Sequence, residues 1–237
     1  MYVAVFAFGA IVGSFLNVLL FRKNTGESVM YSRSRCFLCG KKLSWFELIP
    51  ILSFIIQRGK CRPPPGGCGS KISWQYPVVE LTIAILSLTV ATRLVPYTVS
   101  SYGLWLMAYG FYFSAFCSLF LIAAYDFKHK IIDRHFLYIF AGFSVAEFVW
   151  KNFNVSTTFS AGIVFLFFYS LWRFSGGRWM GRGDADLAFF LALFVGFPLS
   201  LFGFLGAFWI GAIVGIFLLL APIKKFTIKS EVPFGPF

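Results

Sequence analysis

Charged residues are scarce in this chain, and acidic ones are the scarcest. Among 237 residues there are nine Asp and Glu against 21 Lys and Arg, and charged residues of both signs make up only 13% of the sequence. Hydrophobic residues account for 59%, aromatic residues account for 21%, and the mean hydropathy is +0.79. This composition excludes an ordinary soluble domain and indicates an all-α polytopic membrane protein.

Seven apolar runs approach the length of about 17–25 residues that a helix needs to cross the roughly 30 Å hydrocarbon core of a bilayer. They cover residues 1–21, 77–95, 102–125, 136–151, 157–172, 185–199 and 201–222. The fourth, fifth and sixth runs are short, so a tilted, partly buried or re-entrant arrangement stays open for each of them. We therefore expect about seven transmembrane helices.

The first run lacks the preceding basic segment and the small-residue cleavage site of a removed signal peptide, so it is expected to remain as the first transmembrane helix. Lys and Arg set the orientation, because cytoplasmic loops retain them. Residues 22–76 carry ten Lys and Arg against Glu27 and Glu47, which predicts a cytoplasmic loop and an N-terminus outside. The other basic clusters fall on the same side, in residues 126–135, 173–184 and 223–237.

Most of the net charge of +12 follows from this topology. The basic loops also complement anionic lipid headgroups, and no motif supports nucleic-acid binding, so we expect the lipid bilayer as a partner and no nucleic acid. The chain is expected to divide into four segments. They are the first transmembrane helix (1–21), a cytoplasmic cysteine-rich domain (22–76), the transmembrane helices (77–222) and a cytoplasmic tail (223–237).

Four of the five cysteines lie in the long loop as two pairs, Cys36 with Cys39 and Cys61 with Cys68. In a reducing compartment, four paired thiolates favour a tetrahedral zinc ion over disulfides, and such a zinc ion holds a small fold together. Unmetallated thiols or a redox pair remain the alternatives, because the second pair is wider than usual. Cys117 lies inside an apolar run and is interpreted as a small buried hydrophobic residue.

A shorter apolar stretch, from Trp45 to Ile56, lies in the same loop and is interrupted by Pro50. It is too short to cross a bilayer. Two interpretations stay open: this stretch forms the core of the small cysteine-rich domain, or it lies as a helix in the membrane interface.

Acidic residues at membrane edges are candidate functional groups, because a charge in the hydrocarbon core is costly. Two doublets, Asp126 with Asp133 and Asp184 with Asp186, fall at cytoplasmic ends of the expected spans, so the topology brings them to one membrane face. Two neighbouring carboxylates share a proton. One then acts as a base on water and the other as an acid toward a carbonyl, which is the chemistry of aspartic proteases.

Gly181 and Gly183 come directly before Asp184 and would let the backbone approach an extended peptide. Glu80 is a single acid near the cytoplasmic end of the second span, where it is expected to pair with a basic residue or to contact a ligand. The alternative to catalysis is that the aspartates balance neighbouring Lys and Arg, and that those before the apolar run cap a helix.

Several segments, taken in order, resemble the type 4 prepilin leader peptidases, a family of GxGD aspartic membrane proteases. These segments are GSFLNVLLFR, SRCFLCGKKLSWFELIPILSF, RGKCR, YPVVEL, YDFKHKIIDR, GRGDADL and PFGPF, and the resemblance covers most of the chain. It implies an aspartic endopeptidase of the bacterial inner membrane with its active site facing the cytoplasm. Such an enzyme removes the basic leader of type IV prepilins or pseudopilins after a glycine.

Asp126 and Asp184 match the two catalytic aspartates of that family, whose members usually have eight membrane helices. Many members also methylate the new N-terminal amine with S-adenosylmethionine. That activity is associated with the cytoplasmic loop, here from Cys36 to Glu80.

The sequence departs from the family pattern at four places. Ile132 replaces a proline before Asp133, and Asp186 stands where a lysine is usual. The second cysteine pair is widened, and the chain stops at PFGPF, where family members usually continue into a last span, so a shortened or truncated version is expected.

Three other functions stay open at this stage. One is a methylase carried by the loop, with an inactive protease core. Another is a proton- or cation-coupled membrane transporter that uses the same aspartates, which the lack of a visible internal repeat disfavours. The last is a membrane assembly scaffold whose charged loop binds a cytoplasmic partner.

Overall fold

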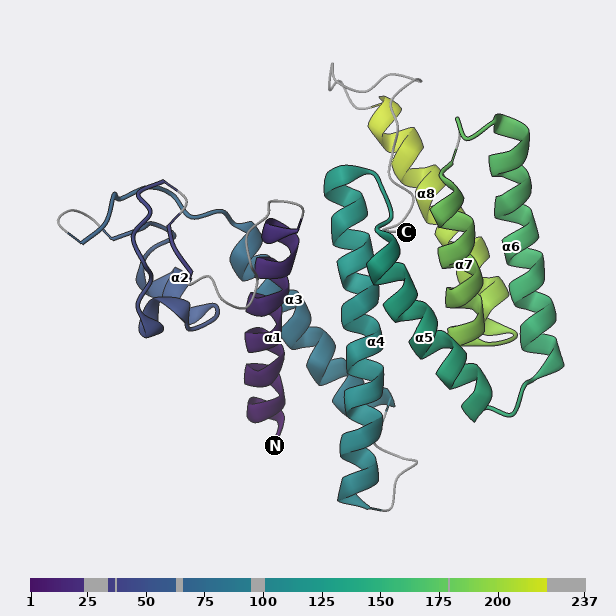
Figure 1. Ribbon diagram of the computed structural model, residues 1–237, viewed down its shortest axis with the longest axis horizontal. Helices are drawn as coiled ribbons and strands as arrows, with labels where there is room; N and C mark the ends of the chain where they lie inside the picture. Colours follow the sequence, from purple (N-terminus) through teal and green to yellow (C-terminus); the bar gives the residue numbers. More distant parts are fainter. Residues whose placement is uncertain (24–33, 37, 63–65, 95–100, 179, 221–237) are drawn as a thin grey trace. The chain divides into compact units, whose positions relative to one another are not determined.

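A computed structural model describes residues 1–23, 34–36, 38–62, 66–94, 101–178 and 180–220 (Figure 1). The expected tail at 223–237 lies outside these residues. The described residues are mostly helical and contain no named strand, only two isolated β-bridges, so the all-α prediction is confirmed. The chain forms two compact units, Met1–Phe116 and Cys117–Phe237, which are described separately.

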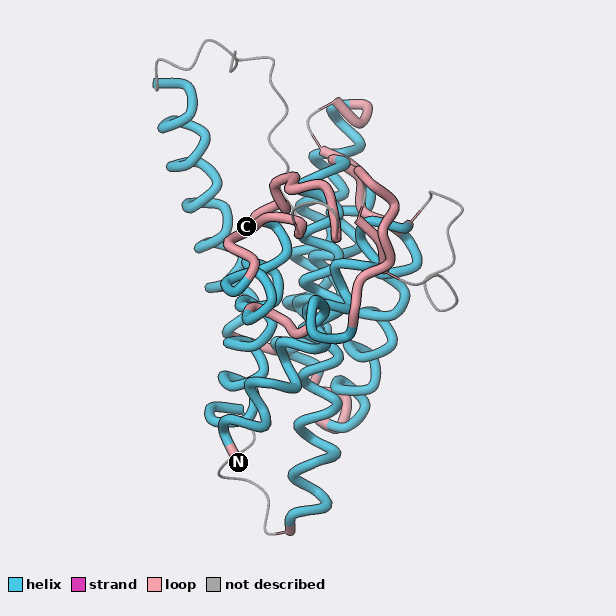
Figure 2. The backbone as a smooth tube through the Cα atoms, turned by 90° about the vertical axis from the view of Figure 1, so that its left-hand side faces the viewer, coloured by secondary structure: helices cyan, strands magenta, loops and turns pink. Residues whose placement is uncertain are grey.

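Each of the seven apolar runs coincides with a long helix (Figures 1 and 2). These helices are α1 (Tyr2–Arg22), α3 (Gln75–Thr89), α4 (Tyr102–His129), α5 (Arg134–Trp150), α6 (Val155–Ser175), α7 (Arg182–Val195) and α8 (Leu199–Leu220). The shorter elements are η1 (Trp45–Leu48), α2 (Leu52–Ile56) and η2 (Val90–Leu94).

Four described helical segments are long and apolar enough to cross a membrane. They are Tyr2–Arg22, Gln75–Arg93, Tyr102–His129 and Val155–Ser175, with a shorter apolar segment at Leu199–Ile213. The protein is therefore polytopic, and the number of crossings beyond these four stays a prediction.

In the first unit, α1 packs along α3 through two glycines one turn apart. A Cβ atom on Gly9 would lie 2.8 Å from Cα of Ala84, and one on Gly13 would lie 2.8 Å from Cα of Glu80. Small residues allow this close approach of two backbones, as is common for helices that pack within membranes. The Ser87 hydroxyl strengthens the contact by donating a hydrogen bond to the carbonyl of Val5 at 2.8 Å.

The described residues 34–74 form a small lobe on the same unit, which we call the cysteine lobe. Two short hairpins carry the cysteine pairs, one closed by the bridge between Arg35 and Lys42 and the other by the bridge between Lys60 and Lys71. Gly40 and Gly69 take positive φ angles of 68° and 66° at these turns, a backbone conformation that glycine adopts without steric cost. The elements η1 and α2 lie between the two hairpins.

In the second unit, α7 packs against both α5 and α6. The core between α6 and α7 is made of small and branched residues with one aromatic ring: Ala161, Val164, Phe168, Ala185, Ala192 and Leu193. Asn154 caps α6 by accepting a hydrogen bond from the Ser156 amide at 2.9 Å, and Gly176 ends that helix in the left-handed conformation. This packing holds the first turn of α7 in place.

Candidate active site and cysteine cluster

Asp126 lies one turn before the end of α4, and only 5% of its surface is exposed. The helix ends directly afterwards: Lys130 takes a positive φ of 54°, and its amide donates to the Asp126 carbonyl at 2.7 Å. The ring of Tyr125 lies beside that of His129, with centroids 4.4 Å apart. Asp126 is thus a buried acid in the last turn of α4, just before the chain turns into α5.

Asp184 lies in the first turn of α7, before the apolar part of that helix and outside the four candidate spans. The Gly181 amide donates a hydrogen bond to Oδ2 of Asp184 at 3.0 Å, and the Asp184 amide donates to the Gly181 carbonyl at 3.3 Å. This reciprocal pair is the geometry of a capping box with glycine at the N-cap. It fixes the carboxylate at the start of the helix.

Asp126 and Asp184 lie near enough to each other in the second unit for the charge of one carboxyl to act on the other. Burial, and then the charge of Asp126, raise the pKa of the Asp184 carboxyl to about 6, while the hydrogen bond from Gly181 opposes the rise. Asp184 therefore binds a proton at a pH where an ordinary aspartate has lost it. One protonated and one ionised carboxyl can coexist in this pair near neutral pH.

The segment before α5 and the first turn of α7 are in contact at Gly183. A Cβ atom on Gly183 would lie only 3.1 Å from Cβ of Ile132, so the turn before α5 packs directly on the first turn of α7. Ile132 is the residue that replaces the proline of the family pattern, and here it forms the contact surface for Gly183. The two glycines of this motif therefore differ: one orients a carboxylate and the other permits close packing.

Asp133 and Asp186 are placed differently from the central pair. Asp133 caps α5, because its Oδ1 accepts hydrogen bonds from the amides of His135 at 2.9 Å and Phe136 at 3.4 Å. The His135 ring nitrogen Nδ1 lies 3.4 Å from the same oxygen. Asp186 is half-buried, two residues beyond Asp184 on α7. The capping role expected for the aspartates before the apolar run is found at Asp184, which accepts from the Gly181 amide, whereas Asp133 caps a different helix, α5.

The four loop cysteines form one cluster in which all sulfur atoms lie within 4.8 Å of one another. The sulfurs of Cys36 and Cys68 are 3.9 Å apart. Four thiolates around a zinc ion at about 2.3 Å would lie roughly 3.8 Å apart, so the donor set fits a tetrahedral metal. The wide spacing of the second pair does not prevent this, because the hairpin brings Cys61 and Cys68 to the same point.

Hydrogen bonds prepare two of these thiols for ionisation. The Cys39 amide is the main cause that lowers the pKa of Cys36 to about 6, and the Ser70 hydroxyl, 3.0 Å from the sulfur, is the main cause that lowers the pKa of Cys68. Thiolates are the form that binds metal. Cys117 is buried in α4 and lies outside the cluster, as predicted.

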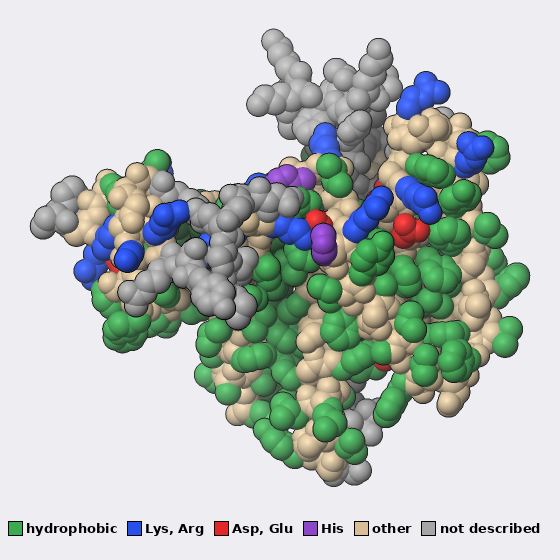
Figure 3. All heavy atoms as spheres, viewed as in Figure 1, with side chains coloured by type: hydrophobic (Ala, Val, Ile, Leu, Met, Phe, Trp, Pro, Cys, Tyr) green, Lys and Arg blue, Asp and Glu red, His purple; other side chains and the backbone are tan. Residues whose placement is uncertain are grey.

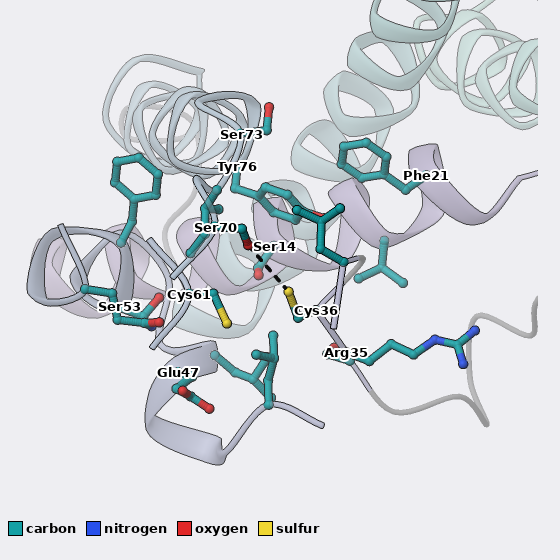
Figure 4. Close-up of a pocket in the computed structure, with 18 of the residues that line it drawn as sticks. Ser14, Phe21, Arg35, Cys36, Glu47, Ser53, Cys61, Ser70, Ser73 and Tyr76 are labelled. Carbon is teal, nitrogen blue, oxygen red and sulfur yellow. Dashed lines mark hydrogen bonds between the residues drawn. The ribbon is translucent and has the colours of Figure 1, made fainter. Parts of the chain in front are cut away.

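A cavity of about 330 Å³ lies between the cysteine lobe and the ends of α1 and α3 (Figure 4). In the close-up, Cys36, Cys61 and Ser70 turn toward the middle of the cavity, whereas Arg35 points away. Tyr76 of α3 contributes an aromatic wall, and its ring stacks on that of Phe21 with centroids 5.2 Å apart.

Two buried acids also line this cavity. Glu80 accepts a hydrogen bond from the Ile51 amide at 2.7 Å, and no basic side chain is paired with it among the described residues, so contact with a ligand stays the expectation for Glu80. Glu47 is ion-paired with Lys41 at 3.1 Å and Arg62 at 3.5 Å. Burial opposes ionisation of Glu47, but bonds from the Ser44 amide and Lys41 hold its pKa below the ordinary value.

The sequence analysis missed the roles of Glu47 and Ile51. Glu47 is counted above only as an acid of the basic loop, although the SWFE segment carries the Ser-x-x-Glu pattern of a capping box, which the structure contains. Ile51 adopts a φ of 62°, which is rare for a β-branched residue, and no sequence signal marks it.

The helices and the paired aspartates define a polytopic membrane protein with a candidate acid pair at a helix terminus. Two family models match the chain: the bacterial Peptidase A24 N-terminal domain over residues 7–94, and the type IV leader peptidase family over residues 113–216. The chain belongs to the type IV leader peptidase family. No solved structure matches it.

Several curated relatives carry the name prepilin leader peptidase/N-methyltransferase. The one from Myxococcus xanthus (strain DK1622) is 32% identical over 92% of this chain, which spans 63% of that protein. The one from Bacillus subtilis (strain 168) is 30% identical over 98% of this chain and 88% of the relative. The one from Pseudomonas putida is 27% identical over 97% of this chain and 84% of the relative.

Proposed function

We propose that the chain is a membrane aspartic endopeptidase that cleaves the leader of type IV prepilins or pseudopilins, with Asp126 and Asp184 as its catalytic pair. The observation that carries this proposal is the electrostatic coupling of these two carboxyls, of which Asp184 holds its proton to about pH 6. Family membership and the names of the relatives support the same activity.

The pair performs hydrolysis by dividing two roles. The ionised carboxylate takes a proton from water, whose oxygen attacks the carbonyl carbon of the scissile peptide, and the protonated carboxyl donates its proton to the carbonyl oxygen. Return of a proton to the leaving amine then breaks the C–N bond. A buried pair favours this chemistry, because a partly dry site strengthens the coupling that keeps one proton bound.

The approach of a peptide is favoured by the exposed backbone at Gly181. A Cβ atom there would contact only Oδ2 of Asp184, at 3.4 Å, among the described residues. An extended substrate segment would lie against this open backbone and present its carbonyl to the Asp184 carboxyl. The positive-inside pattern supports a bacterial inner-membrane location with the N-terminus outside and this site facing the cytoplasm.

A zinc ion is the proposed occupant of the cysteine cluster, held by Cys36, Cys39, Cys61 and Cys68. Bound there, zinc would supply cross-linking of the two hairpins and no chemistry on the peptide, because all four ligand positions are filled by protein.

Transfer of a methyl group to the new N-terminus is a second candidate activity, favoured by the cavity of about 330 Å³ beside the cysteine cluster. Its volume lies at the lower end of the range for small-molecule sites. S-adenosylmethionine would supply an electrophilic methyl group, and Tyr76 and Glu80 are the residues proposed to line its site. The amine would have to lose a proton to attack the methyl carbon, with S-adenosylhomocysteine as the leaving group, and the Glu80 carboxylate would accept that proton.

The test of the peptidase proposal is cleavage of a prepilin by the full chain reconstituted in lipid vesicles. Asp126→Asn and Asp184→Asn should each abolish leader removal while the protein is still made and inserted. Asp133→Asn, which changes the carboxylate that caps α5 but leaves the proposed catalytic pair intact, should leave substantial cleavage. Retained cleavage in both single variants at the pair would overturn the proposal.

Methylation is tested separately with a radiolabelled methyl donor and already cleaved pilin. Glu80→Gln should reduce incorporation of label without reducing leader removal, and Asp184→Asn should have the opposite effect. The transporter alternative has no support from the three relatives described above, each of which carries the name prepilin leader peptidase/N-methyltransferase.

A further inference from the structure

The apolar stretch around Pro50 is not the core of the cysteine lobe. Trp45 and Ile56 are each 78% exposed, and Leu52 and Ile55 on α2 are also exposed. Trp74, directly before α3, is 72% exposed. We call these five residues the apolar face of the lobe. So much exposed apolar surface on one small lobe indicates an interaction surface.

Two contacts determine where the apolar face lies along the axis of α3. The Ile51 amide, which begins α2, is hydrogen-bonded to Glu80 at 2.7 Å, and the rings of Phe54 and Trp74 have centroids 4.9 Å apart. Glu80 is five residues beyond Gln75, where the candidate span Gln75–Arg93 begins. Five residues of helix correspond to about 8 Å, so α2 lies level with the terminal turns of a membrane-crossing helix.

In a bilayer, the terminal turns of a membrane-crossing helix lie at the boundary between the lipid headgroups and the acyl chains. The headgroup layers add roughly 5–8 Å on each side of the hydrocarbon core, and interfacial helices bury their apolar face by about 5–10 Å. The lipid-exposed side of α3 continues the same surface, because Val78, Leu81 and Ile85 are exposed on that helix. The apolar face of the lobe therefore adjoins a surface that the bilayer already covers.

The charges of the lobe favour an anionic surface. Its exposed charged side chains among the described residues are all basic: Arg35, Lys42, Arg58, Lys60, Arg62 and Lys71. Its one described acid, Glu47, is buried and ion-paired with Lys41 and Arg62. Figure 3 shows hydrophobic side chains along the lower border of this lobe, with Lys and Arg side chains above them.

We propose that the cysteine lobe is docked on the bilayer, with its apolar face inserted at the interface and Arg58 and Lys60, which follow α2, over anionic lipid headgroups. Tryptophan at both ends of the face, at positions 45 and 74, is typical of membrane interfaces. A basic leader peptide would be repelled by the same charges, so charge complementarity favours lipid over the substrate. The proposal does not depend on the peptidase chemistry.

The experiment places the photo-crosslinker p-benzoylphenylalanine at position 56, in the full chain reconstituted in vesicles of phosphatidylcholine and phosphatidylglycerol. The same residue at position 42, an exposed site on the first cysteine hairpin, is the matched control. Unchanged metal content and unchanged leader removal show that both labelled proteins are folded.

The expected result is a phospholipid adduct at position 56 that exceeds the adduct at position 42 several-fold, with or without added prepilin. Lys60→Glu should lower the adduct at position 56 in the mixed vesicles but not in phosphatidylcholine alone. Equal lipid yields at the two positions, or adducts at position 56 with prepilin or a second copy of the chain in place of lipid, would overturn the proposal.

Discussion

The backbone amide of Gly181 donates a hydrogen bond to Oδ2 of Asp184 at 3.0 Å. The residue that starts α7 thereby orients the carboxyl that is coupled to Asp126. A helix N-terminus favours negative charge, and this bond lowers the pKa of Asp184, whereas burial and Asp126 raise it further. The balance leaves Asp184 as an acid that can hold or release a proton near neutral pH.

The two glycines before Asp184 should respond differently to alanine. Gly183→Ala places a Cβ atom 3.1 Å from Cβ of Ile132. The added atom should push the segment before α5 away from α7 and cost about 1–3 kcal/mol of stability. Gly181→Ala makes only an ordinary contact, at 3.4 Å, and should cost only the roughly 0.5 kcal/mol by which alanine is a poorer N-cap residue than glycine. Thermal unfolding in lipid measures the difference, and equal destabilisation by both variants would contradict this packing.

Leader removal should depend on pH through Asp184. An unfolded aspartate loses its proton near pH 3.9, whereas Asp184 in the folded protein keeps it to about 6. Because the folded pKa is raised, the stabilisation from protonation is complete below the unfolded value and is lost as the pH rises through about 6.

Cleavage requires one protonated carboxyl, so kcat/KM should fall as the pH rises above that value. A profile of kcat/KM against pH in vesicles is the measurement. A rate that stays flat from mildly acidic to alkaline pH would refute the assignment of Asp184 as the proton donor. Asp126→Asn removes the like charge and should lower the pKa of Asp184, which can be followed by carboxyl NMR.

The contact between α1 and α3 should tolerate no side chain at Gly13. A Cβ atom there would lie 2.8 Å from Cα of Glu80, so Gly13→Ala must push the helices apart and should cost about 1–3 kcal/mol. Gly162 on α6 is the matched control, because a Cβ atom added there meets nothing within 4 Å among the described residues. Unfolding of both variants in the same detergent gives the comparison. Similar stability in both would show that the helices are not in contact at Gly13.

The cysteine cluster should hold one metal ion per chain. Cys36→Ser should remove most of the metal and loosen the lobe, because a structural zinc contributes directly to folding. Cys117→Ser should keep the metal, since that thiol is buried elsewhere. Metal analysis of the purified proteins decides the matter: a metal-free parent protein, or equal metal in both variants, would exclude the site.

Much of the fold could be predicted from periodicity and composition, because helices in lipid must be apolar over most of their length. A helix covers each of the seven apolar runs, and the ends of the helices differ from the ends of the runs by a few residues. The shift is clearest at α4, which continues past the end of its apolar run to include Asp126 and His129. A helix continues there because its backbone hydrogen bonds do not require apolar side chains.

The geometry of the site depended on contacts between segments distant in sequence. Pairing of Asp126 with Asp184 could be expected from topology, but the contact of Gly183 with Ile132 could not, because steric fit between two loops leaves no local signal. The same holds for the bond from Ile51 to Glu80, which needs a rare backbone conformation. The wide spacing of the second cysteine pair counted against a metal site, whereas the hairpins bring all four sulfur atoms within 4.8 Å of one another.

Asp126 and Asp184 are proposed to act as one catalytic unit, and a double-mutant cycle tests whether they share one step. Rates of leader removal would be compared for the parent chain, Asp126→Asn, Asp184→Asn and the double variant in the same vesicles. Residues that share one step are strongly non-additive, so the double variant should be no slower than either single variant. If the rate loss of the double variant is the product of the two single losses, or if one single variant keeps near-parent activity, Asp126 and Asp184 do not act as one unit.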